Sequence, residues 1–285
     1  MKEIRNGSFT GERALYNIHD TSIYDSTFFD GESPLKECSN LKIYNTFFKW
    51  KYPMWYSENI YVKDSVLLET ARSGIWYTKH IELVDTMIEA PKTFRRSSDI
   101  RLINCSMPIA DETLWNCENI YMSNVTAKGN YLGLNSKNIE IKDFKLNGNY
   151  AFDGASNIKI DNAILISKDS FWNCENVEVK NSTIIGEYIG WNSKNITFIN
   201  CTIDSNQGLC YMDNVKLVDC KLVNTNLSFE LCSNIDATIN SRIESVKNPL
   251  SGSIKAKSIG LIIQDNMNYR GKVIDNTKTK IEVEE

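Results

Sequence analysis

The chain has 285 residues, of which 42% are hydrophobic, and a formal net charge of −4 from 32 basic and 36 acidic residues. Because these charges are mixed along the sequence, they give no electrostatic case for a nucleic-acid or membrane partner. No stretch has the apolar length of a signal peptide or a bilayer span, so we expect a cytoplasmic protein.

A short phrase recurs along the chain with a period of 19 to 21 residues. Each copy opens on an anchor residue, usually Asn, and carries apolar residues at the first and third positions after it. The anchors are Asn40, Asn59, His80, Asp99, Asn119, Asn138, Asn157, Asn176, Asn195, Asn214 and Asn234. A fixed period near 20 is typical of a solenoid, in which each unit buries its apolar face by stacking on its neighbours.

The pattern inside one repeat predicts strands. Apolar residues alternate with polar ones after the anchor, as in Asn176-Val177-Glu178-Val179, which is the period of a half-buried strand. Asn or Asp five residues after the anchor ends this strand. A second apolar position follows at +8 and a third at −5 from the next anchor, so we expect an all-β, single-stranded parallel β-helix with three short strands per coil.

Stacked coils lie about 4.8 Å apart, so each repeat position becomes a column. We expect the anchor amides to form an internal ladder, as in stacked cross-β structures. His80, which replaces Asn in this column, is therefore interpreted as structural.

The repeat predicts a single β-helix domain over residues 1–285. Residues 1–39 form the N-terminal coils, 40–240 the regular coils, and 241–285 an irregular cap with a hairpin near 268–272. No amphipathic helix is predicted to cover the first coil, so a second subunit is one expected partner.

Seven of the eight cysteines occupy one of two places in the repeat, and three of them, Cys105, Cys201 and Cys220, stand six residues after an anchor. Cys38, Cys117, Cys174 and Cys232 stand two residues before an anchor, where other coils have Ser or Thr. We interpret them as small buried residues. No CxxC pair exists and the only histidines are His19 and His80, so we expect no metal and no cofactor.

Several phrases carry a resemblance to a known family. They are GERAL at 11–15, GESPLKE at 31–37, WKYPMWYS at 50–57, ETLWNC at 112–117, GEYIGWNS at 186–193 and QGLCY at 207–211. With them the whole chain resembles a bacterial domain-of-unknown-function family, the one numbered 3737. The resemblance implies a right-handed β-helix similar to pectin lyases, without an established activity or catalytic residues.

Five of the six tryptophans share the repeat position four before the anchor, next to the buried one. They are Trp55, Trp76, Trp115, Trp172 and Trp191, and position −7 on the same face adds Tyr52, Tyr131, Tyr150 and Tyr188. Flat aromatic faces suit sugar rings, so we expect this exposed strip to bind an oligosaccharide or a similar polyhydroxylated ligand. The alternative is a scaffold whose aromatic face binds a protein or a second copy of the chain.

The same face carries the candidates for catalysis, as a polysaccharide lyase or a glycoside hydrolase. Glu112 and Asp153 are expected about 10 Å apart, near the upper limit for an inverting pair. Asp153 and Asp169 are expected roughly 5 Å apart, where repulsion raises one pKa. Arg95 and Lys92 could serve as base or carboxylate clamp. Alternatively, all five are solvated residues in weak ion pairs.

Overall fold

The computed structural model describes residues 2–265, 272–275 and 280–282. The chain divides into two compact units, Met1–Leu146 (unit 1) and Asn147–Glu285 (unit 2). Parallel strands stack in each unit, and the one helical element described is the short turn η1 (Glu69–Ala71). The expected all-β parallel solenoid is therefore confirmed. No helix in the described ranges is long and apolar enough to cross a membrane.

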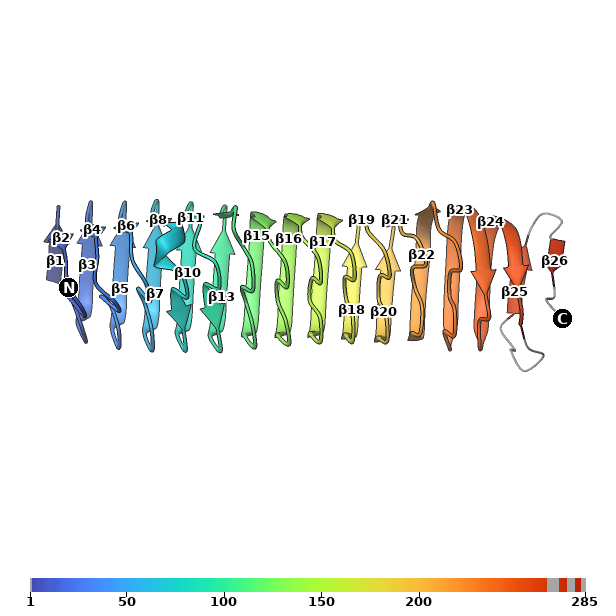
Figure 1. The fold of residues 1–285 in the computed structure, drawn as a ribbon, viewed down its shortest axis with the longest axis horizontal. Coiled ribbons are helices and arrows are strands. Elements are labelled where there is room, and N and C mark those ends of the chain that lie inside the picture. Colours follow the sequence, from blue (N-terminus) through green and yellow to red (C-terminus); the bar gives the residue numbers. More distant parts are fainter. Residues whose placement is uncertain (1, 266–271, 276–279, 283–285) are drawn as a thin grey trace. The chain divides into compact units, whose positions relative to one another are not determined.

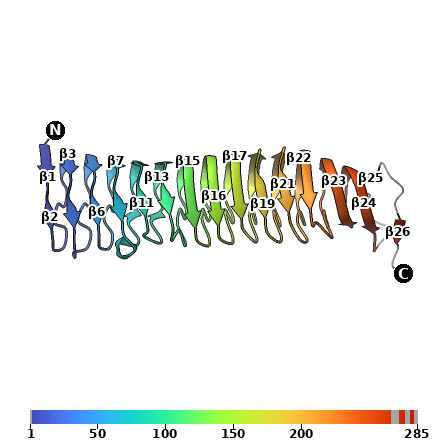
Figure 2. The same ribbon diagram turned by 90° about the horizontal axis from the view of Figure 1, so that it is seen from above.

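Two series of strands build unit 1 (Figure 1, Figure 2). The first comprises β1 (Lys2–Arg5), β3 (His19–Tyr24), β5 (Ser39–Tyr44), β7 (Glu58–Lys63), β10 (Lys79–Val84), β13 (Ser98–Ile103), β15 (Glu118–Lys128) and β16 (Lys137–Asn147), which reaches the unit boundary. The second comprises β2 (Ser8–Phe9), β4 (Thr27–Phe28), β6 (Phe47–Phe48), β8 (Val66–Leu67), β11 (Met87–Ile88) and β14 (Ser106–Met107). Ile60 pairs with Ile81, and Ile81 with Ile100, so residues one repeat apart are neighbours.

Unit 2 follows the same plan, and several of its strands run through both series. Its strands are β17 (Ser156–Ile166), β18 (Glu175–Lys180), β19 (Thr183–Ile185), β20 (Lys194–Ile199), β21 (Thr202–Asp204), β22 (Asp213–Val223), β23 (Ile235–Lys247), β24 (Gly252–Ile263), β25 (Lys272–Asp275) and β26 (Lys280–Glu282). β25 and β26 both pair in parallel with β24. The hairpin expected near 268–272 lies almost wholly outside the described residues.

The third strand expected in each coil forms in two coils among those described, as β9 (Ile75–Trp76) and β12 (Phe94–Arg95). In most of the other described coils the segment before the anchor is a turn, and Trp115 forms a single parallel bridge to Arg95. The coil through Tyr150 shows why, because Tyr150 (φ 59°) and Phe152 (φ 64°) are both left-handed. Two such residues bend the chain too sharply for an extended strand, although Phe152 still points inward and is fully buried.

Asn and Asp mark the corners because the backbone there is left-handed. Asn40, Asn59 and Asn119 have φ of 55°, 55° and 56°, which short side chains that bond locally tolerate best. Their amides form the expected ladder, with Asn59 Nδ2 donating to Asn40 Oδ1 at 3.1 Å. The ladder lies on the surface, which corrects the expectation of an internal one, since the left-handed corner turns the side chain outward.

The column two residues before the anchor ties neighbouring coils together inside the core. Ser57 Oγ donates to Leu35 O at 2.8 Å and accepts the Cys38 N–H at 3.2 Å. Cys174 Sγ donates to Phe152 O at 2.8 Å in the same way. All eight cysteines are free and buried, as expected, and burial raises the pKa of Cys117 to about 12.

Candidate functional site

The tryptophans of unit 1 form the column that the repeat predicts. The rings of Trp55 and Trp76 stack with centroids 5.1 Å apart and planes 7° apart. The guanidinium carbon of Arg95 continues the stack, 4.9 Å from the Trp76 centroid and 4.3 Å from that of Trp115. The flat faces of these rings are therefore directed at one another and at Arg95.

Each of these indoles is also bonded to the next coil. The ring N–H of Trp55 donates to Ser73 O at 2.6 Å, and that of Trp76 to Lys92 O at 2.8 Å. Trp115 donates to Tyr131 O at 2.6 Å. The rings are half-buried and held by the backbone, so the strip presents mainly ring edges and a sugar cannot stack between its members.

Unit 2 has a second, less regular aromatic column. Trp172 donates to Tyr188 O at 2.9 Å, and its ring lies 6.1 Å from that of Trp191 at 36°. Trp191 in turn lies 4.3 Å from Tyr211, which the repeat analysis did not select. Tyr150 meets Trp172 edge-on, so position −7 does share the face of position −4.

Three of the catalytic candidates meet in unit 1. Glu112 Oε2 accepts a 2.6 Å hydrogen bond from Arg95 and lies 3.1 Å from Lys92 Nζ. The Arg95 Nε is buried and has no hydrogen-bond partner among the described residues. One carboxylate oxygen is thus shared by two cations, an arrangement that holds the Glu112 side chain in place.

The other two candidates lie in unit 2. Asp153 Oδ1 accepts a 2.9 Å hydrogen bond from Asn173 Nδ2 and so belongs to a corner ladder. Asp169 is only 1% exposed, and its Oδ1 has no hydrogen-bond partner in the part of the chain that the structure describes. Burial raises the pKa of Asp169, and the charge of Asp153 contributes least. The pKa shift has the expected direction, but its main cause is desolvation and not repulsion between the two carboxylates.

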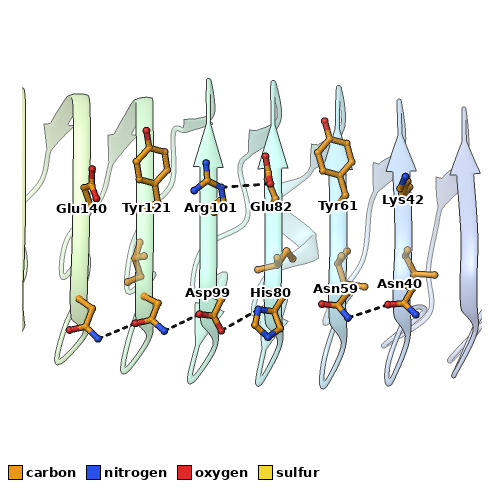
Figure 3. A pocket seen from close by; sticks show the side chains of 16 residues that line it. Asn40, Lys42, Asn59, Tyr61, His80, Glu82, Asp99, Arg101, Tyr121 and Glu140 are labelled. Carbon is orange, nitrogen blue, oxygen red and sulfur yellow. Dashed lines mark hydrogen bonds and ion pairs between the residues drawn. The ribbon is translucent and has the colours of Figure 1, made fainter.

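A groove that the sequence analysis did not select crosses the first strand series of unit 1 (Figure 3). It encloses about 740 Å³ and runs over six coils. Its floor is backbone, since Leu41, Ile60, Ile81 and Ile120 are no more than 2% exposed and point into the core. The two rims are the anchor column and the column two residues after it.

The anchor rim is a chain of polar contacts. Asn40 donates to Asp20 at 3.0 Å while accepting from Asn59. Further along, Asn119 donates to Asp99 Oδ1 at 2.9 Å. His80 Nδ1 lies 3.4 Å from the other Asp99 oxygen, which gives it the structural position expected from the repeat.

The opposite rim combines charge with aromatic rings. Its side chains are Lys42, Tyr61, Glu82, Arg101, Tyr121 and Glu140, which point out of the sheet in one row (Figure 3). Arg101 Nε lies 3.7 Å from Glu82 Oε2, and the Arg101 guanidinium lies 4.5 Å from the Tyr121 ring centroid. The signal for this rim was present as the polar position between two buried ones, but every half-buried strand has such a position.

Residues 2–282 match the family described as "Protein of unknown function (DUF3737)". The chain belongs to this family. The match confirms the family resemblance noted for the six phrases between residues 11 and 211, and it extends over nearly the whole of the chain. No curated protein matches the sequence.

The solved structures that resemble the chain are distant. The surface adhesin PfbA of Streptococcus pneumoniae is 11% identical with a TM-score of 0.37, covering 93% of this chain and 74% of that one. The pentapeptide repeat protein HetL from Nostoc sp. strain PCC 7120 is 8% identical (TM-score 0.32; 79% and 89%). The A-module of the Azotobacter vinelandii mannuronan C-5 epimerase AlgE4 is 8% identical (TM-score 0.29; 99% and 88%). None of these likenesses bears on function.

Proposed function

We propose that the protein binds a linear oligosaccharide, or a similar polyhydroxylated chain, in the groove of unit 1. The observation that carries the proposal is the repetition of hydrogen-bonding amides along one rim. Asn40, Asn59 and Asn119 stand at the same repeat position, and the coils are spaced by about 4.8 Å. A ligand built of repeating units is the kind of molecule that such a periodic rim suits.

The chemistry of the rim fits hydroxyl groups. A carboxamide has two N–H donors and two acceptor lone pairs. In the ladder Asn40 uses one donor toward Asp20 and one acceptor toward Asn59. One donor and one acceptor remain on this exposed side chain, which is the pair that a sugar hydroxyl requires.

The opposite rim supplies the remaining contacts. Tyr61 and Tyr121 are half-buried and offer ring surface together with a phenolic hydroxyl. Arg101 and Lys42 offer charged donors, so a ligand with carboxylate substituents would gain paired hydrogen bonds. The strip of stacked tryptophans then serves the fold of unit 1 rather than the ligand.

Binding without reaction is the form that we propose. Glu112 already shares its carboxylate with Arg95 and Lys92, so this oxygen is engaged by two cations and is not directed at a ligand. A hydrolase or lyase activity at the five candidates would be an addition to this proposal. A pectin-lyase-like ancestry and a cytoplasmic location also remain proposals.

The test is a glycan array followed by calorimetry on the strongest ligand. We expect Tyr61→Ala and Tyr121→Ala each to weaken binding by about tenfold, equivalent to 1.4 kcal/mol. Matched controls are Lys159→Ala and Lys216→Ala, which change the same repeat position in unit 2, and Trp115→Phe in the aromatic strip. Full-length protein that binds no glycan, or that loses binding equally with the controls, would contradict the proposal and favour the alternative of a protein-binding scaffold.

A further inference from the structure

The first coil of unit 1 leaves its apolar interior partly open. Ile4, Phe9, Leu15 and Ile18 are only half-buried. One coil further, their counterparts are Ile23 (0% exposed), Phe28 (2%), Leu35 (0%) and Cys38 (1%). Among the described strands β1 pairs only with β3 and β2 only with β4, so the outer edge of this coil has no strand on it (Figure 2).

The backbone of β1 is arranged to accept another strand. The Asn6 N–H donates to Tyr24 O at 3.1 Å, so in the peptide between Arg5 and Asn6 the N–H points toward β3 and the C=O of Arg5 points away from it. Alternate residues of a strand point these groups to opposite sides. In β1 the main-chain groups of Ile4 therefore bond toward β3, whereas the N–H and C=O of Glu3 and Arg5 point away from it. An unpaired edge of this kind is a template for strand addition.

The side chains of the same two residues are charged and complementary. Arg5 donates to Glu3 Oε2 from both Nε and Nη2 at 3.1 Å, and the side chains are 53% and 54% exposed. An antiparallel strand paired about Ile4 would place a residue at position 3 of one copy opposite position 5 of the other. With a second copy of this chain, Glu3 would face Arg5 of the partner subunit, twice by symmetry.

We propose that two copies associate head to head through β1, with Ile4 on the twofold axis. In this register the outward main-chain groups of Glu3 and Arg5 form the close hydrogen-bonded pairs of an antiparallel ladder. The same twofold axis brings the two open interiors together, so the side chains of Ile4, Phe9 and Ile18 lose their remaining exposure to solvent. This isologous contact closes on itself and leaves the groove of unit 1 available on each copy.

A charge-swap experiment tests the register. Wild-type protein should have twice its 32.6-kDa chain mass by light scattering after size-exclusion chromatography. Glu3→Arg gives two Arg on each β1 and Arg5→Glu gives two Glu, so each variant alone should repel itself. We expect the dimer dissociation constant of each to rise by about tenfold or more. An equimolar mixture of the two should restore a dimer, because opposite charges then face each other.

The matched controls are Glu178→Arg and Lys180→Glu on β18, which form a similar ion pair of 2.7 Å at the same repeat positions. Because β18 lies between β17 and β20, these variants should dimerise as wild type does. Circular dichroism of every variant establishes that the fold is kept. A monomeric wild type, or a mixture that stays monomeric, would overturn the proposal.

Discussion

Arg95 and Glu112 form the shortest ion pair on the aromatic face of unit 1, with Nη2 and Oε2 separated by 2.6 Å. The guanidinium is held between the rings of Trp76 and Trp115, so its position is set by stacking as well as by charge. Lys92 adds a second cation 3.1 Å from the same oxygen. The pair therefore joins neighbouring coils and holds the two side chains in fixed positions.

This arrangement predicts a cost to stability when the carboxylate is removed. Glu112→Gln keeps the size of the side chain but leaves the partly buried guanidinium without its anion, so we expect the free energy of unfolding to fall by about 1 kcal/mol. Lys92→Met, at a more exposed position, should cost about half as much. Urea denaturation measures both. An unchanged midpoint for Glu112→Gln would mean that the pair contributes nothing.

The left-handed corners predict an inverted order of two substitutions. Asn119 has φ of 56° and donates to Asp99. Asn119→Gly and Asn119→Ala both remove this bond, but only Ala pays for the left-handed backbone. We therefore expect Ala to be less stable than Gly by about 1 kcal/mol. At Lys42, in mid-strand, the order should be the ordinary one with Gly less stable. Thermal melts of the four variants measure the two orders, and the same order at both sites would contradict the left-handed conformation at Asn119.

Much of this architecture could be predicted because a period of about twenty fixes which residues become neighbours. The buried positions Ile81 and Leu83 and the column from Trp55 to Trp76 follow directly from it. A period does not fix where side chains turn at a corner. The exposure of the Asn59 amide depends on the left-handed backbone at the corner, which sequence spacing does not report. The burial of the Asp169 carboxyl does not follow from the spacing either, since Asp169 is also left-handed and yet only 1% exposed.

The groove of unit 1 could not be predicted from the sequence, for a related reason. Lys42, Tyr61 and Arg101 occupy the outward position of ordinary half-buried strands, and nothing in a single repeat distinguishes them. A concavity arises only when the outward row and the anchor row flank a strip of bare backbone. That relation between two columns requires the corner geometry as well as the register.

The cysteines provide a prediction about reactivity. Burial raises the pKa of the Cys38 and Cys105 thiols to about 11, and raises that of Cys210 to about 12. Thiols react as thiolates, so the native protein at pH 8 should react slowly with a disulfide reagent. All eight should react promptly in denaturant. Rapid release of several equivalents from native protein would show that the core opens readily.

Asp169 provides a prediction about pH. Burial is the main reason that the pKa of Asp169 is raised, whereas the positive charge of Lys168 and a hydrogen bond from Tyr150 both lower it. A folded-state pKa above the unfolded value near 3.9 means that the carboxyl favours folding below that pH. This contribution is lost as the pH rises through the folded-state pKa.

Asp169→Asn removes the titration while keeping the shape of the side chain, so its stability relative to wild type should increase between about pH 4 and pH 7. Tyr150→Phe removes the bond that favours the ionised form and should make the wild-type pH dependence steeper. In the Asp169→Asn background, Tyr150→Phe should no longer change the pH dependence of stability, since no carboxylate charge is left to stabilise. Unfolding midpoints at the two pH values test each step. If the unfolding midpoints of wild type and Asp169→Asn change in parallel with pH, the carboxyl is solvated and its burial has no energetic consequence.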